Sequence, residues 1–142
     1  MVEFALLLPI LLLLLGGVYG IGRAYAQYET LSKATRDGAR MLSMANKTTI
    51  NSVGVDLAKQ RVADMAQAGG MPDFTESNVV VTCLAPTTYA DTSCADGTEP
   101  GGVRVETTGW VYALGSVVPI SYPNNVSNLT LKASTTMRYM RP

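Results

Sequence analysis

The two cysteines, Cys83 and Cys94, carry the most reactive side chains in this 142-residue chain. Two thiolates are too few for a structural zinc site, and their spacing differs from the CxxC of redox enzymes. The segment APTTYADTS between them has no apolar body that would bury a free thiol. We therefore expect a disulfide, which would close a loop of about a dozen residues, stabilise the fold by roughly 3 kcal/mol and require an oxidising compartment. Two free thiols in a cytosolic loop are the less favoured alternative.

Histidine is absent from the sequence, which removes the commonest general base and the most frequent zinc ligand. Catalysis would have to rely on Ser/Lys or Asp/Glu pairs, and no spacing commits any of these residues to that role. The formal net charge is zero and no cluster of Lys and Arg stands out, so binding to a nucleic-acid backbone has no electrostatic basis. We expect no catalytic residue, no cofactor and no metal site, and the function is then structural or one of binding.

An uncharged run extends from Phe4 to Gly22. As a helix, about 19 residues measure roughly 28 Å, which is close to the hydrocarbon thickness of a bilayer. The run is longer than the apolar region of a secretory signal peptide, and no small-residue cleavage site follows it. Glu3 stands at its front edge, where an ionised carboxylate must find a partner or stay near the lipid headgroups. We predict that this segment spans a membrane.

Two further features of the run favour a helix that packs against copies of itself. Pro9 removes the amide that would bond the carbonyl of Ala5, so we expect a kink or a local loosening there. Gly16 and Gly20 form a GxxxG pattern, which lets another helix approach closely. Each feature alone is compatible with a simple membrane anchor, but together with Glu3 they indicate an assembly segment.

The opening of the chain contains a specific pattern, VEFAL followed by LP. Its residues are Glu3, Phe4, Ala5, Leu6, Pro9 and the pair Gly22-Arg23. Over about the first 40 residues the chain resembles TadE-like proteins, the pilin-like components of tight-adherence (Tad) pili within the type IV pilin group. The resemblance implies cleavage of a leader after a glycine by an inner-membrane peptidase, and a glutamate at the fifth mature position. Because Glu3 is third here, we expect the mature chain to begin about two residues upstream of Met1.

The resemblance also implies an orientation and a role for the glutamate. Four basic residues follow the apolar run and by the positive-inside tendency would hold the rest of the chain in the cytoplasm, whereas the expected disulfide requires the opposite side. These residues are Arg23, Lys33, Arg36 and Arg40. A basic leader, as the family implies, would place the C-terminal part outside. Glu3 would then pair with the free amino terminus of a neighbouring subunit, neutralising a buried charge and fixing the axial register.

The pattern beyond the run predicts that the first helix continues from Val2 to Met44. Residues suited to packing recur along it at spacings of four and three, which places them in one seam on one face of the helix. They are Ala24, Tyr28, Leu31, Thr35, Gly38 and Leu42. The charged flank, which includes an i,i+4 pair of Glu29 and Lys33, is most simply a solvated face, although in a filament the same charges could pair between subunits.

A turn over residues 46–51 and a second helix over 52–68 follow, and Gly69-Gly70 with Pro72 ends this helix. The pattern then changes to period two, which predicts three antiparallel strands over 78–85, 103–114 and 129–140. In the last strand, Leu129, Leu131, Ala133 and Met137 alternate with Thr130, Lys132, Ser134 and Arg138, so one face should pack on the helices and the other should meet water.

The predicted fold class is α+β and type IV pilin-like, with an assembly helix over 1–44 and an extracytoplasmic domain over 45–142. At Gly109 the polar face of the second strand gives way to aromatic residues, which indicates a bulge. Trp110, Tyr112, Tyr122 and Tyr139 are better suited to core packing than to a ligand platform. The glycosylation triplets at Asn46, Asn125 and Asn128 are best interpreted as ordinary turn asparagines.

Three functions fit these observations. The leading hypothesis is a structural subunit, not an enzyme, that leaves the bacterial inner membrane and polymerises through its apolar helix into an extracellular adhesive pilus. Its partners would be copies of itself, possible other pilins, the prepilin peptidase and the inner-membrane assembly platform. The first alternative is a minor TadE-type pseudopilin that primes or regulates a pilus of another subunit. The second, from another class, is a membrane-anchored binding module of the cell envelope, which would need a pocket with convergent polar groups.

Overall fold

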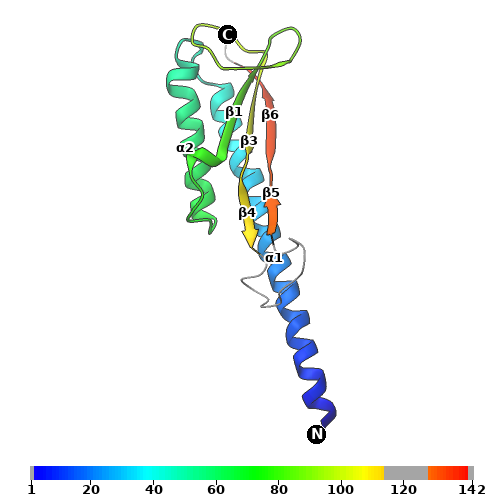
Figure 1. Cartoon of the computed structure of the whole chain (residues 1–142). Coiled ribbons are helices and arrows are strands. Elements are labelled where there is room, and N and C mark those ends of the chain that lie inside the picture. Colours follow the sequence, from blue (N-terminus) through cyan, green and yellow to red (C-terminus); the bar gives the residue numbers. More distant parts are fainter. Residues whose placement is uncertain (1, 114–127, 141–142) are drawn as a thin grey trace. The chain divides into compact units, whose positions relative to one another are not determined.

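The computed structural model describes residues 2–113 and 128–140 and has the predicted α+β class (Figure 1). Its helical elements are α1 (Val2–Ser43), the 3-10 turn η1 (Lys47–Thr49), the π-helical turn η2 (Ile50–Gly54), α2 (Val55–Ala68) and the 3-10 turn η3 (Glu76–Asn78). Its strands are β1 (Val79–Leu84), β2 (Asp91–Thr92), β3 (Gly102–Thr107), β4 (Trp110–Ala113), β5 (Asn128–Leu131) and β6 (Ser134–Arg138). The chain packs into two units, Met1–Ala26 with Val111–Thr130 and Gln27–Trp110 with Leu131–Pro142.

The first helix is one continuous element of 42 residues, about 63 Å long, and it continues through Pro9. It ends within one residue of the predicted boundary. Ser43 closes it by donating its hydroxyl to the carbonyl of Arg40 at 2.8 Å. The same helix therefore contributes its apolar N-terminal part to the first unit and its amphipathic C-terminal part to the second.

The second unit is built from two layers. A four-stranded antiparallel sheet, in the order β2-β1-β3-β6, forms one layer, and α2 and the C-terminal part of α1 lie side by side along one face of it (Figure 1). The largest fully buried apolar side chains between the layers are Phe74, Leu31, Leu42, Ile50, Met71, Val62, Val103 and Val105. Burying each such side chain is worth about 1.5–3 kcal/mol, so this core is a main source of stability for the second unit.

The packing seam of α1 is confirmed at five of the six predicted positions. Ala24, Leu31, Thr35, Gly38 and Leu42 are buried. The prediction was wrong at Tyr28, which is 43% exposed, whereas Gln27 is buried. The two residues are one position apart, about 100° around the helix, and the buried arc passes through Gln27.

Gly38 is where α1 comes closest to its neighbours. A Cβ atom at this position would lie 2.6 Å from Cγ2 of Val62 and 3.4 Å from the carbonyl oxygen of Ala58, both on α2, and 3.8 Å from Cγ1 of Val105 on β3. The missing side chain thus sets the distance between the two helices.

The second predicted strand, over 103–114, is two strands. β3 pairs with β1 and β6, whereas β4 pairs with β5 in a separate two-stranded sheet. Gly109 lies between them with a φ of +71°, a backbone conformation that favours glycine. The buried side chains before Gly109 are at odd-numbered positions, Val103, Val105 and Thr107, whereas Tyr112 after it is at an even-numbered one. The predicted change of face at Gly109 is therefore present, but it is a break between two strands and not a bulge.

The third predicted strand, over 129–140, is also divided in two. Leu131, Ala133 and Met137 point inward as predicted, but Leu129 is 43% exposed. At the division the backbone N–H of Ala133 donates to the hydroxyl of Thr107 at 2.9 Å, while the N–H of Thr107 donates to the carbonyl of Ala133 at 2.8 Å. The buried hydroxyl replaces one bond of the ladder, which lets the pairing stop without an unsatisfied amide.

The second helix begins earlier than predicted and a strand inside the cysteine loop was missed. Helical backbone starts at Ile50 as the π-helical turn η2, and regular α-helix follows from Val55. The C-terminus agrees with the prediction, since α2 ends at Ala68 and Gly70 takes a φ of +88°. The short strand β2 pairs with β1 in a segment for which no strand was predicted, and the sheet has four strands as a result.

We expect Gly38→Ala to lower the thermal stability of the full chain in detergent micelles. The added Cβ must displace Val62, a stiff β-branched side chain, at a cost of about 1–3 kcal/mol that exceeds the gain in helix propensity. Gly22→Ala is the matched control, because nothing lies within 4 Å of a Cβ at that exposed position of the same helix. Equal melting temperatures for both variants would contradict the close packing at Gly38.

We expect Thr107→Val to destabilise the second unit by about 1–3 kcal/mol, because the buried amide of Ala133 loses its acceptor while the side-chain volume is kept. Denaturant unfolding of the full chain in micelles measures the change. Thr130→Val, at an exposed position of β5, serves as the control and should be close to neutral. A neutral Thr107→Val variant would show that the amide finds another acceptor.

Candidate functional site

The most unusual surface of the molecule is the N-terminal part of α1, which is apolar and exposed. Phe4 is 72% exposed. The other large apolar side chains exposed on this part of α1 are Leu6, Leu7, Leu8, Ile10, Leu11, Leu12, Leu13, Leu14, Leu15, Val18, Tyr19 and Ile21. Among the residues that the structure describes, α1 is the one helix long and apolar enough to cross a membrane. A patch of this size marks a surface for lipid or for other proteins.

The predicted assembly residues occupy different environments on this helix. Glu3 lies in its first turn, and Phe4 and Pro9 are on exposed positions. Gly16 is half-buried, whereas Gly20 is buried within the chain on the same face as Ala24. Only part of the GxxxG pattern is thus open to a second helix.

The exposed helix offers no polar side chain between Phe4 and Val18. A helix bonds most of its backbone amides and carbonyls internally, apart from the carbonyl of Ala5, which lacks a donor because Pro9 has no amide hydrogen. The segment can therefore enter a medium without water at a small polar cost. Such a surface has no reactive group, and it is suited to contact with lipid or with the apolar side chains of other helices. Gly17 and Gly22 add positions where the backbone can be approached closely, since nothing lies within 4 Å of a Cβ built on either.

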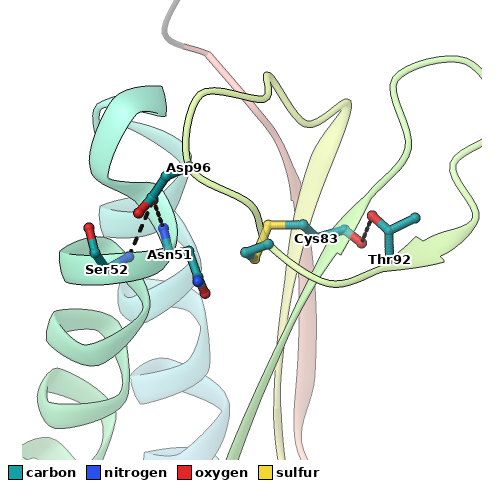
Figure 2. Close-up of a disulfide and its surroundings, with 6 residues drawn as sticks. Asn51, Ser52, Cys83, Thr92 and Asp96 are labelled. Carbon is teal, nitrogen blue, oxygen red and sulfur yellow. Dashed lines mark hydrogen bonds between the residues drawn. A yellow bond between two sulfur atoms is a disulfide. The ribbon is translucent and has the colours of Figure 1, made fainter.

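A disulfide stabilises the cysteine loop in the second unit. Cys83 and Cys94 are joined, with their Cα atoms 5.0 Å apart (Figure 2). Cys83 is buried in β1, and its carbonyl accepts a hydrogen bond from the hydroxyl of Thr92 in β2 at 3.1 Å. The disulfide and the β1–β2 pairing therefore hold the same hairpin, as expected of a domain that matures in an oxidising compartment.

Asp96 attaches the cysteine loop to the helical layer. Its carboxylate accepts from the backbone N–H groups of Asn51 at 2.7 Å and Ser52 at 3.3 Å (Figure 2). The N–H of Gly97 donates to the carbonyl of Lys47 at 2.8 Å beside it. The hydrogen bond from Asn51, with smaller contributions from Ser52, lowers the pKa of Asp96 below its ordinary value of 3.8, although desolvation opposes the shift. Sequence reasoning missed this contact, because the capping residue lies far along the chain from the amides that it caps.

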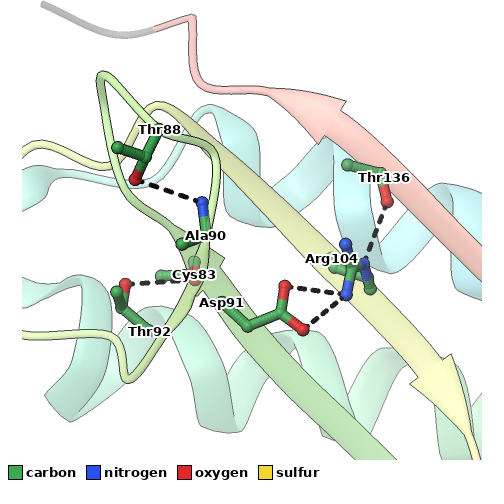
Figure 3. A network of polar contacts seen from close by, with 7 residues as sticks. All are labelled: Cys83, Thr88, Ala90, Asp91, Thr92, Arg104 and Thr136. Atoms are coloured by element: carbon green, nitrogen blue, oxygen red, sulfur yellow. Dashed lines mark hydrogen bonds and ion pairs between the residues drawn. The ribbon is translucent and has the colours of Figure 1, made fainter.

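An arginine ties three strands together on the outer face of the sheet. Arg104 in β3 donates through Nη1 to both carboxylate oxygens of Asp91 in β2, at 2.8 Å each, and through Nε to the hydroxyl of Thr136 in β6 at 3.3 Å (Figure 3). The pair is partly exposed, so its contribution to stability is small, and its effect is to orient the short strand β2.

The segment that follows β6 is bonded to the end of α1 and to the residues just after it. The hydroxyl of Tyr139 donates to the carbonyl of Ala45 at 2.7 Å, and the N–H of Met140 donates to the carbonyl of Ser43 at 3.1 Å. The second bond satisfies a carbonyl in the last turn of the helix, which has no intrahelical partner. Tyr139, Tyr112 and Trp110 serve the interior as predicted, with Trp110 packed on Phe74 at a ring distance of 5.7 Å, while Tyr122 lies outside the described residues.

The second unit has several hollows, one of which, of about 190 Å³, has Glu106, Lys132 and Ser134 in its lining. A cavity of about 240 Å³ at the cysteine loop is lined mainly by apolar side chains, among them Ile50, Leu84, Pro86 and Pro100, and also by Thr98 and Glu99. A further hollow of about 320 Å³ is open to solvent beside Tyr89 and Arg138. Over residues 2–113 and 128–140, no three His, Cys, Asp or Glu side chains gather as metal ligands would.

Two of the three triplet asparagines can be placed. Asn46 accepts from the N–H of Thr48 at 3.2 Å and so caps η1, which agrees with a turn asparagine. Asn128 is the exposed first residue of β5, and Asn125 lies outside the described residues.

Comparison with known proteins identifies the N-terminal segment. Residues 1–40 match the family model described as TadE-like protein, which confirms the resemblance on the part of the chain that carries it. No curated protein and no solved structure matches the chain significantly. A TadE-like N-terminus suggests a pseudopilin associated with a Tad pilus and thus located in the cell envelope. The matched residues are those of the exposed apolar helix and its continuation into the second unit.

We expect the attachment of the cysteine loop by Asp96 to be lost in acid. The folded pKa is lower than the unfolded value, so the carboxylate stabilises the contact above pH 3.8 and ceases to do so as the pH falls through the lowered pKa. Asp96→Ala should therefore speed hydrogen exchange at the amides of Asn51 and Ser52 at pH 7 and change little below the folded pKa. Asp64→Ala, on an exposed position of α2, should leave both amides protected, and faster exchange there too would show a general loosening of the helix.

Proposed function

We propose that this chain is a structural pilin-like subunit that assembles through the apolar part of α1 into an extracellular filament of the Tad pilus class. The observation that supports this most is the coincidence of the exposed apolar surface with the segment that matches the TadE-like family. The subunit would be inserted in the inner membrane before assembly and would carry its second unit on the extracytoplasmic side.

In the proposed mechanism, the apolar side chains of α1 stay out of water throughout assembly. Each Leu, Ile or Phe that is kept from water is worth about 1.5–3 kcal/mol, so the apolar part of α1 must pass directly from lipid into a bundle of identical helices. Lipid tails are as apolar as leucine, so exchange between the two environments gives little driving force. Close packing and the pairing of polar groups must then make the helix bundle more stable than the membrane-inserted state.

Glu3 is the residue proposed to supply that pairing, together with the free amino terminus of a neighbouring subunit. Two opposite charges removed from water must pair, and pairing can occur in one axial register, so the contact would set the spacing between subunits. Phe4 and the half-open Gly16 would contribute shape to the same contact, and Pro9 would allow local adjustment of the helix. Gly20 would support the helix within its own chain.

The proposed partners follow from this mechanism. They are copies of the same chain, other pilins where the filament is mixed, a prepilin peptidase and an inner-membrane assembly platform. A catalytic role is not part of the proposal, since no histidine is present and no spacing in the sequence assigns a Ser, Lys, Asp or Glu residue to catalysis.

A second candidate is a minor pseudopilin that primes a filament of another subunit. The suggestion of a pseudopilin by the TadE-like match favours it. The two functions differ in stoichiometry, so quantitative mass spectrometry of purified filaments separates them. One copy of this chain per filament repeat supports the structural subunit, whereas traces confined to filament ends support the primer.

We expect Glu3→Ala to leave the chain in the membrane but to remove it from filaments. An unpaired buried amino terminus costs about 3–5 kcal/mol at every subunit addition, enough to stop growth. Immunoblots of membrane and sheared fractions measure the two pools. Glu29→Ala is the matched control, since this exposed glutamate lies on the same helix beyond the apolar run, in an ion pair with Lys33. Wild-type incorporation of Glu3→Ala would refute the proposed role of Glu3.

A further inference from the structure

We propose that the second unit carries its own contact between copies, in which a basic stripe on one subunit faces an acidic loop on the next. The basic stripe is Arg36 and Arg40 on α1, and the acidic loop is Asp73 and Glu76 around η3. The inference rests on the proposed function, since it requires copies to lie side by side in a filament. It adds a second recognition element outside the apolar helix.

The charges of the chain are strongly segregated along the sequence. The first 61 residues contain seven basic side chains against four acidic ones. From Val62 to Val103 there are six acidic side chains and no basic one. The formal net charge of zero therefore conceals an excess of basic residues in one part of the sequence and of acidic residues in another, and electrostatic complementarity between copies requires opposite charges of this kind.

Several of these charges already have partners within the fold. In the acidic stretch, Asp91 pairs with Arg104, Glu99 lies 4.0 Å from Lys47, and Asp96 accepts the backbone amides of η2. In the basic part, Lys33 pairs with Glu29 and Arg61 with Asp37.

Both members of the basic stripe and both members of the acidic loop are among the charges without such a partner in the described part of the chain, as are Asp56, Lys59 and Asp64. Within residues 2–113 and 128–140, the side chains of Arg36, Arg40, Asp73 and Glu76 make no ion pair or hydrogen bond, and all four are exposed. Charges that are unused inside the chain are available to a neighbour.

Both charged surfaces are held by rigid supports. Arg36 and Arg40 are one helical turn apart, and their neighbours Thr35 and Ala39 are fully buried against the second unit. The acidic loop is held at Phe74, which is fully buried and whose carbonyl accepts from Nε2 of Gln67 at 2.8 Å. Fixed positions reduce the entropy lost when exposed charges pair.

The turn that carries Glu76 is also closed by its own polar contacts. A capping box between Thr75 and Asn78 closes η3, with the N–H of Thr75 donating to Oδ1 of Asn78 at 3.0 Å. Glu76 lies inside this box, so the backbone that presents its carboxylate is fixed.

A second copy suits the basic stripe better than a lipid headgroup does. Arg36 and Arg40 follow Gly22, where the apolar run ends, by 14 and 18 residues of sequence, whereas Arg23 is next to it. Under the proposed function Arg23 is therefore the basic residue suited to the headgroup layer, and the basic stripe is left for a neighbouring copy.

The two surfaces differ, so the contact between them is heterologous. A patch on one copy that binds a different patch on the next copy extends into a ring or an open helical array, and a filament needs the second. Exposed ion pairs are individually weak, but a like-charge contact at the same place is strongly unfavourable. The pairing would therefore act mainly on register and on the exclusion of wrong neighbours.

Charge reversal in the full-length chain, expressed in its own cells, tests the proposal. We expect Arg36→Glu with Arg40→Glu to reduce the chain recovered in sheared filaments by about ten-fold or more, with an unchanged amount in the membrane. Asp73→Lys with Glu76→Lys should have the same effect. Combining all four substitutions restores opposite charges across the contact and should return filaments toward the wild-type amount.

The control is Lys132→Glu with Arg138→Glu, which makes the same change in net charge at two exposed residues, one between β5 and β6 and the other at the end of β6. It should leave filaments unchanged, and a loss equal to that of the stripe variant would overturn the proposal by showing an effect of net charge alone. Two losses without rescue in the fourfold variant would also overturn it. In that case reduced binding of the stripe variant to vesicles of phosphatidylglycerol and phosphatidylethanolamine would assign the stripe to lipid.

Failure of this inference can be told from failure of the proposed function. If filaments contain the chain and both reversals assemble as the wild type does, the charged contact is refuted while the structural subunit stands. If the wild-type chain is absent from filaments, the proposed function fails first, and the contact between copies fails with it.

Discussion

One constraint governs this molecule, which is that a continuous apolar surface on α1 must stay out of water. Among the described residues this surface is exposed, whereas the later part of the helix packs on the sheet and α2, with Leu31 and Leu42 fully buried. An apolar surface of this size needs lipid or another protein to cover it.

Contacts between residues far apart in the sequence hold the rest of the chain in place. Asp96 accepts the amides that open the second helical segment, Thr107 satisfies the amide at a strand break, and Tyr139 bonds a carbonyl just beyond the end of α1. Each places a side chain where the backbone has lost its regular partner, and buried backbone groups must be satisfied. The disulfide keeps the loop that carries Asp96 close to β1. Rigidity of the second unit makes exposed charges on its surface useful for recognition.

Periodicity was enough to predict both helices and the positions of most strands, and the TadE-like pattern around Glu3 and Pro9 indicated the class of the protein. It failed where pairing partners change. The runs 103–114 and 129–140 each have the alternating apolar and polar residues of one strand. That pattern does not show that the backbone turns at Gly109, or that the hydroxyl of Thr107 accepts the amide of Ala133 in place of a backbone carbonyl. Periodicity also missed β2, because a strand of two residues is too short to show an alternating pattern. This strand is defined by its pairing with Cys83 and Leu84 of β1.

The sequence by itself determined the membrane-length apolar helix, the disulfide and the α+β class, because hydrophobic period, run length and cysteine count are local properties. The tertiary structure alone decided which residues of α1 face the core, with Gln27 in place of Tyr28, and that Gly20 is covered while Gly17 is open. It also decided which charges are used inside the chain and which are left exposed. Those outcomes depend on which distant segments pack together, and a linear pattern does not contain the distances between them.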